Sequence, residues 1–145
     1  MTQPDDYVPS LFPSVRDQVA LYEATDGREG GTLEGRPVVI LTHRGARSGK
    51  LRKTPVMRIE LGPGYLVVAS YGGAPNHPSW YHNLIANPLV LVRDGDTLRS
   101  MVAREAAGPE KAALWETADA AWPHFPEYRA STTREIPLLV LEPPG

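Results

Sequence analysis

The chain has 145 residues, of which 41% are hydrophobic, and carries a net charge of −2. This length fits one domain that buries one core. The absence of cysteine excludes disulfides, thiolate metal sites and a cysteine nucleophile. No apolar run approaches the ~20 residues of a membrane helix, and the N-terminus lacks the features of a signal peptide. We therefore expect a cytoplasmic protein, with peripheral membrane contact left open for its N-terminal segment.

The first half of the chain predicts one helix followed by strands. Residues 1–13 contain three prolines and predict an extended lead-in, and Val15, Val19 and Tyr22 then fall at helical spacing until Gly27. Residues 38–41, 54–61 and 65–70 are rich in β-branched and apolar side chains. These three segments predict strands joined as a β-meander.

The second half predicts helices at both ends of a hairpin. A helix would begin at 76–78 and end at 87–88, where prolines are suitably placed. Residues 89–92 and 97–104 would pair around an Asp-Gly-Asp turn. A helix from Gly108 to about Ala121, stopped by Pro123, and a strand at 136–141 follow. About six antiparallel strands with outer helices form a small barrel, and a parallel Rossmann sheet is disfavoured.

The charges are unevenly placed. Between residues 42 and 59 stand six basic residues and no acidic one, while the rest of the chain has 15 − 6 = 9 basic and 17 acidic residues. The six are Arg44, Arg47, Lys50, Arg52, Lys53 and Arg58. Such a segment is either a site for a polyanion or a solvated basic hairpin.

Several familiar catalytic motifs are absent. The stretch from Gly45 to Lys50 has the wrong spacing for a phosphate-binding P-loop, and no G-x-G-x-x-G occurs. The four histidines lack metal-ligand spacing, so no metal is expected. Ser48 and Ser70 do not lie in G-x-S-x-G. If the protein is an enzyme, a bound cofactor should carry the chemistry.

Two segments, 42–55 and 69–88, combine features of a ligand site. A glycine-rich turn beside arginines suits phosphate or carboxylate. Gly72 and Gly73 allow a flat ligand to approach the backbone, and Trp80 and Tyr81 follow as stacking walls or as core.

These segments resemble the deazaflavin-dependent nitroreductase family, which are coenzyme F-420-dependent split-barrel enzymes typical of actinobacteria. The resemblance covers about residues 36–143. The matching positions are Gly45, Arg47, Ser48, Gly49, Arg52, Pro55, Ala69, Ser70, Gly72, Gly73, Trp80, Tyr81, Asn83, Leu84, Ala86, Asn87, Pro88, Thr132, Arg134, Ile136 and Pro137. It implies an α+β, mainly β fold: a six-stranded antiparallel split β-barrel with flanking helices. Residues 1–35 would be a lead-in and helix, and residues 36–145 the deazaflavin-binding part of a single domain.

The resemblance also implies site residues. The coenzyme's phosphate and oligoglutamate tail would lie against Ala46, Arg47, Ser48, Gly49, Lys50 and Arg52. The deazaflavin ring would be bordered by Pro55, Ala69, Ser70, Tyr71, Gly72 and Gly73. Ala46 and Tyr71 stand where the family often has arginine and lysine, so two anion contacts are missing. Arg134 is interpreted as a structural ion pair rather than a catalytic group.

The implied reaction is hydride transfer from reduced F-420 to a quinone or nitro-aromatic acceptor. Ser70 and Tyr128 would be catalytic, and Trp80, Trp122, Phe125 and Tyr128 would bind the acceptor. Because Trp122 and Phe125 lack hydroxyls, we expect a preference for apolar quinones over nitroimidazoles, with the late aromatic segment acting as a lid.

Three alternatives remain open: an FMN- or haem-binding barrel, a deazaflavin carrier or sensor without turnover, and nucleic-acid binding, which is disfavoured. The sequence predicts no oligomeric state.

Overall fold

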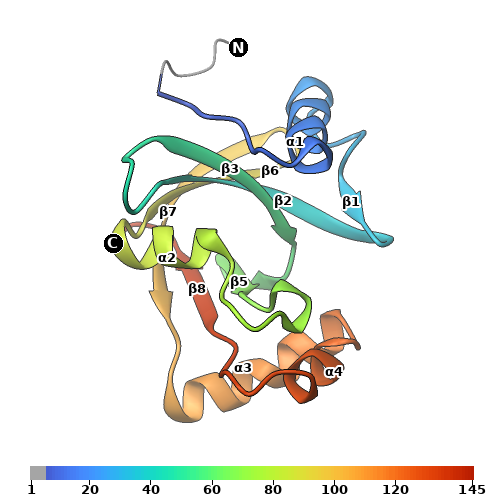
Figure 1. The fold of residues 1–145 in the computed structure, drawn as a ribbon, viewed down its shortest axis with the longest axis vertical. Coiled ribbons are helices and arrows are strands. Elements are labelled where there is room, and N and C mark those ends of the chain that lie inside the picture. The colour runs from blue at the N-terminus through green and yellow to red at the C-terminus, as the bar shows by residue number, and fades with distance from the viewer. Residues whose placement is uncertain (1–5) are drawn as a thin grey trace.

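The computed structural model describes residues 6–145, which form one curled antiparallel sheet with helices at its ends (Figure 1). Seven strands follow one hydrogen-bonded path in the order β1–β2–β6–β7–β8–β5–β4, and β3 pairs with β2 off this path. The strands are β1 (Thr32–Leu33), β2 (Arg36–Arg44), β3 (Leu51–Met57), β4 (Glu60–Leu61), β5 (Gly64–Val68), β6 (Leu89–Asp94), β7 (Thr97–Glu105) and β8 (Leu138–Glu142). The sheet is an open half-barrel, with β4 at one end of the path and β1 and β3 beside β2 at the other.

The structure corrects two expectations about the sheet. Six strands are too few, and the barrel is not closed. The predicted meander holds only in part: residues 54–61 divide into β3, which pairs with β2, and β4, which pairs with the start of β5, while β5 also pairs with the last strand, β8. Residues Tyr65 to Val68 lie opposite Leu141 to Leu138. A strand far away in the sequence therefore covers the side of β5 that faces away from β4.

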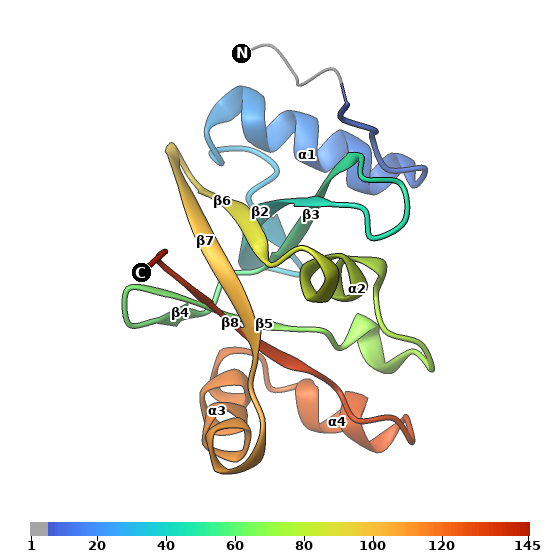
Figure 2. The ribbon, with the colours of Figure 1, turned by 90° about the vertical axis from the view of Figure 1, so that its left-hand side faces the viewer.

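The helices occupy distinct positions around the sheet. They are α1 (Pro13–Thr25), the short η1 (Tyr71–Gly73), α2 (Ser79–Ala86), α3 (Gly108–Ala121) and α4 (Phe125–Ala130). In both ribbon views α1 lies at one end of the molecule, α3 and α4 lie at the other, and α2 lies between them (Figures 1 and 2). The sequence predicted α1, α2 and α3, but α4 was missed. Within residues 6–145, no helix is both long and apolar enough to span a bilayer.

Three buried clusters hold these layers together. The largest fills the concave side of the sheet, where α2 contributes Trp80 and Leu84. A second joins α3 and α4 to the sheet and includes Trp122 and Phe125. The third lies under α1, where Val19 packs on β2. Each helix is held by the apolar face that it buries, which is the main source of its stability in a small domain.

Candidate coenzyme and acceptor site

Two adjoining cavities lie along β3. The first cavity has a volume of about 520 Å³ and is lined by Ser10, Leu11, Phe12, Ser14, Val15, Gln18, Leu33, His43, Arg52, Lys53, Thr54, Pro55, Tyr71, Pro78, Ser79 and Trp80. The second has about 370 Å³ and is lined by Leu33, Glu34, Arg36, Val38, Pro55, Val56, Met57, Val68, Ser70, Tyr71, Gly72, Trp80, Trp122, Phe125 and Tyr128. Four residues, Leu33, Pro55, Tyr71 and Trp80, line both. The two cavities therefore form one cleft of the size that holds small ligands and cofactors.

The basic segment is less free than its sequence indicates. Arg44 pairs with Asp6 at 2.8 Å, Lys53 with Glu23 at 2.7 Å, and Arg58 with Asp94 at 2.9 Å. Arg58 also contacts Glu60. The other three cations, Arg47, Lys50 and Arg52, have no carboxylate partner among residues 6–145. The charge available to an anionic ligand is thus concentrated in these three side chains.

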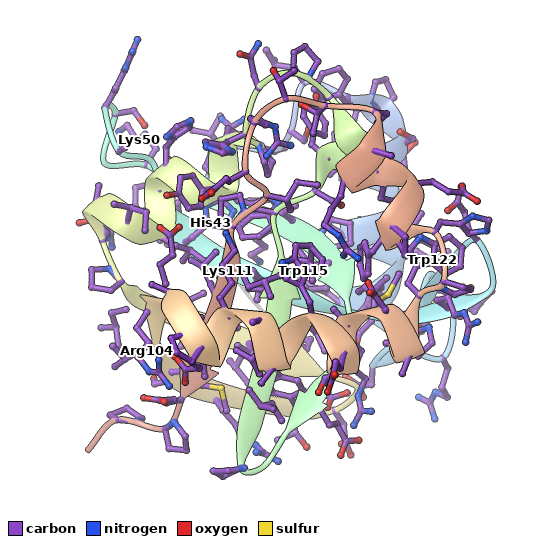
Figure 3. The ribbon with its side chains drawn as sticks, turned by 90° about the horizontal axis from the view of Figure 1, so that it is seen from below. His43, Lys50, Arg104, Lys111, Trp115 and Trp122 are labelled. Carbon is purple, nitrogen blue, oxygen red and sulfur yellow. The ribbon has the colours of Figure 1, made fainter. Side chains whose placement is uncertain are left out.

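The three cations are arranged from the turn toward the cleft. Arg47 and Lys50 are exposed in the turn between β2 and β3, and Lys50 projects away from the body of the molecule (Figure 3). Arg52 is half-buried and lines the first cavity. A long anionic group leaving this cavity toward the turn would meet all three in succession.

The turn is anchored to α2 by Asn83. The Ala46 N–H donates to Asn83 Oδ1 at 2.8 Å, and Asn83 Nδ2 lies 3.0 Å from His43 Nδ1. His43 Nε2 in turn lies 3.0 Å from Thr54 Oγ1. Burial lowers the pKa of His43 to about 4, with a further lowering by the positive charge of Arg52. His43 is therefore neutral at pH 7.

The loop after β5 has an unusual backbone. Tyr71, Gly72 and Gly73 all have positive φ, of 47°, 62° and 81°. A left-handed conformation is costly for tyrosine, and the Tyr71 side chain is 58% exposed beside the cleft. Next to it, Ser70 is buried but lines the second cavity, and its hydroxyl makes no hydrogen bond to any part of the chain from residue 6 onward.

Arg134 holds this loop in place. Its guanidinium donates to the carbonyl oxygens of Ser70 at 2.7 Å, Ala74 at 2.8 Å and Ala69 at 3.3 Å. It also contacts His77 Nδ1 at 2.8 Å. The structural role predicted for Arg134 agrees with these contacts, but the predicted ion pair is wrong, because its partners are carbonyl oxygens and an imidazole.

The late aromatic residues form a fixed wall of the second cavity. Trp122 and Phe125 are 9% and 3% exposed and belong to the buried cluster under α3. Trp122 Nε1 donates to Tyr128 Oη at 3.2 Å, and the Arg36 guanidinium lies 5.6 Å from the Trp122 ring centre. The predicted lid is therefore wrong for Trp122 and Phe125, since moving them would open the core.

Comparison with known proteins identifies the family. The family model described as F420H(2)-dependent quinone reductase matches residues 14–143. The chain belongs to this family. The F420H(2)-dependent quinone reductase of Mycobacterium tuberculosis is 36% identical over 126 residues, covering 84% of this chain and 85% of that protein.

Two solved structures of members of this fold also match. An F420-H2 dependent reductase, FDR-A, is 47% identical, with a TM-score of 0.68, over 74% of this chain and 95% of that one. A structure described as a domain-swapped dimer is 42% identical, with a TM-score of 0.70, over 87% and 92% of the two chains. The predicted resemblance to F-420-dependent enzymes is confirmed, and the family's named acceptor is a quinone.

In this quinone reductase family member, the predicted residues fall into three groups. Those that line the cleft are Arg52, Pro55, Ser70, Tyr71, Gly72, Trp80, Trp122, Phe125 and Tyr128. Those in the turn outside the cavities are Ala46, Arg47, Ser48, Gly49 and Lys50. Ala69 is fully buried behind the loop, and Gly73 lies against α4. Trp80 belongs to the core and also lines the cleft.

Sequence reasoning missed much of the lining of the cleft, including the side of the first cavity that residues 10–18 form. Arg36, His43, Thr54 and Asn83 line the cleft or anchor its turn. Asn83 is one of the positions that match the family, and this match was a usable signal. No motif in the sequence points to Arg36. No group of His, Asp or Glu able to hold a metal occurs in the described part of the chain.

Proposed function

We propose that this chain binds reduced coenzyme F-420 along the two cavities and catalyses its oxidation by a quinone held in the second cavity. The observation that carries the proposal is that the two ends of one continuous cleft differ in chemical character. Unpaired cations stand at the end near the turn, and aromatic side chains stand at the other end. A coenzyme with an anionic tail and a flat ring requires both.

The cleft has the features that such a coenzyme needs. Arg47, Lys50 and Arg52 supply charge for a phosphate and carboxylates, and arginine adds paired donors. Pro55 and Tyr71 line the junction of the cavities, where a flat ring would sit between charge and aromatic wall. A Cβ built on Gly72 would meet no atom within 4 Å, so the loop leaves open space there.

The coenzyme supplies a hydride, and the residues of the second cavity act on the acceptor. As hydride reaches a quinone, negative charge develops on its oxygen, and donors fixed in advance stabilise that charge. The Ser70 hydroxyl has no partner within the described chain, so it is free to donate. Tyr128 Oη accepts from the Trp122 N–H, which leaves the tyrosine proton for the acceptor oxygen. Arg36 adds positive charge at the cavity wall.

The chemistry of the wall favours a quinone over a nitroimidazole. Trp122 and Phe125 offer ring surface, and among the three late aromatics only Tyr128 offers a hydroxyl. A quinone gains from apolar contact and needs few donors, because its polar atoms are two carbonyl oxygens. A nitro-aromatic acceptor belongs to this proposal as the weaker substrate.

We also propose that the cleft opens toward a lipid surface. Leu11 and Phe12 line the first cavity and are 87% and 65% exposed, and Leu33 at the junction is 48% exposed. An apolar rim of this kind would rest on the interface of a bilayer and receive a lipid-soluble quinone.

Coenzyme binding tests the main proposal. We expect Arg47→Ala and Arg52→Ala each to weaken F-420 binding by roughly 1.5–3 kcal/mol, the range for hydrogen bonds to charged groups. Arg99→Ala is the matched control, because Arg99 is an exposed arginine of β7 that lines neither cavity. Fluorescence titration at low and high salt gives the affinities, and the wild-type affinity should fall as salt rises.

Two outcomes would contradict the proposal. FMN that binds as tightly as F-420 would show that the cleft does not select a deazaflavin. Unchanged affinity in both arginine variants at low salt would show that the basic turn is only a solvated surface.

A further inference from the structure

The polar side chains behind the first cavity form a chain of hydrogen bonds with a fixed direction. It starts at the Ala46 N–H, 2.8 Å from Asn83. A backbone N–H can only donate, so the side-chain atom facing it is the carbonyl oxygen, Oδ1. The amide nitrogen, Nδ2, therefore points the other way, toward His43 Nδ1 at 3.0 Å.

Asn83 thereby selects one tautomer of His43. An amide nitrogen is a donor only, so His43 Nδ1 must accept and carries no proton. The neutral imidazole then holds its proton at Nε2, which lies 3.0 Å from Thr54 Oγ1. A doubly protonated imidazole would place two donors face to face at Asn83. His43 is 2% exposed, so no water relieves that conflict.

The direction continues through the hydroxyl of Thr54. Because His43 offers a proton, the Thr54 oxygen accepts, and the hydroxyl's own hydrogen must point elsewhere. Its side chain has no second hydrogen-bond partner in the region from residue 6 to residue 145. Thr54 lines the first cavity, two residues after the cation Arg52 and directly before Pro55 at the junction.

We infer that the Thr54 hydroxyl is a hydrogen-bond donor to an oxygen of the coenzyme, aimed into the cleft by Ala46, Asn83 and His43. This inference rests on the proposed function. Thr54 is the binding residue, and Asn83 and His43 are positioning residues. The same Asn83 amide also holds the turn that carries Arg47 and Lys50, so one side chain sets both the tail-binding turn and the Thr54 donor.

Three substitutions test the donor. Thr54→Val keeps the shape of the side chain and removes the hydroxyl, and Thr54→Ser keeps the hydroxyl. Thr42→Val is the matched control, because Thr42 is a half-buried threonine of the neighbouring β2 that lines neither cavity. We expect Thr54→Val to weaken F-420 binding on the order of tenfold, as for the loss of one hydrogen bond, and the other two to bind within about twofold of wild type.

A deazaflavin without the phosphate and glutamate tail identifies the accepting oxygen. If Thr54→Val weakens the binding of this shorter ligand as well, the oxygen belongs to the ring or ribityl part. If only full-length F-420 is affected, it belongs to the tail. Either result supports the inference, whereas equal binding of both ligands by Thr54→Val and wild type overturns it.

The tautomer of His43 gives a readout that does not depend on turnover or on the variant's folding. In 15N-histidine wild-type protein at pH 7, long-range proton–nitrogen spectra should show His43 as the neutral Nε2–H form. A Nδ1–H or doubly protonated ring overturns the inference and leaves the proposed function intact. If wild-type protein binds no F-420, the proposed function fails, and the Thr54 inference fails with it.

Discussion

Gly73 and Gly72 are adjacent glycines with similar backbones but different surroundings. Their φ values are 81° and 62°, so alanine at either position adopts the left-handed conformation, which costs roughly 1–2 kcal/mol. A Cβ on Gly72 would meet nothing within 4 Å. A Cβ on Gly73 would lie 3.0 Å from the Tyr128 carbonyl oxygen and would collide with Ser131 Oγ. Only Gly73 therefore carries a packing cost in addition to the conformational one.

We expect Gly73→Ala to lower the free energy of unfolding by about 1–3 kcal/mol more than Gly72→Ala, the usual cost of overpacking. The collision involves α4, so Gly73→Ala should also raise the KM for menadione by displacing Tyr128. Urea denaturation with unchanged slopes gives the stability difference, and steady-state kinetics gives the KM. Equal destabilisation by the two substitutions would refute the argument that close contact with α4 requires glycine at position 73.

Two further predictions concern the acceptor wall and the buried histidine. The wild-type protein should reduce menadione faster than a bicyclic nitroimidazole. Phe125→Tyr should shift the ratio of kcat/KM toward the nitroimidazole, whereas Tyr128→Phe should slow the reduction of both acceptors. A wild type that prefers the nitroimidazole contradicts the roles assigned to these aromatic residues. For His43, the folded pKa of about 4 lies below the ordinary value of 6.5, so its stabilising contribution is present above pH 6.5 and is lost as pH falls toward 4. Between pH 7 and pH 4.5, the free energy of unfolding of the wild-type protein should fall by about 2–3 kcal/mol more than that of His43→Gln. If the two free energies of unfolding fall by the same amount over this pH range, the argument is excluded.

The sequence by itself determined the local elements and the family. Gly108 and Pro109 at the start of α3 and the turn between β6 and β7 were predicted correctly, because a cap or a tight turn depends on residues within one or two turns of chain. The order and spacing of the 42–55 and 69–88 motifs indicated the F-420-dependent family. Those motifs also contain Arg52, Pro55, Ser70, Tyr71, Gly72 and Trp80, which line the cleft.

The tertiary structure decided which distant groups meet. Arg134 contacts the loop more than 50 residues before it, and β5 pairs with β8 rather than with β3. Asp6, Glu23 and Asp94 neutralise half of the basic segment, which left the charge at the turn smaller than the sequence indicated. No periodicity in the sequence relates the residues that meet in these contacts. The contacts depend instead on how the sheet and the helices pack around one core. The direction of the hydrogen bonds from Ala46 to Thr54 could likewise be read only after folding had placed α2 against β2.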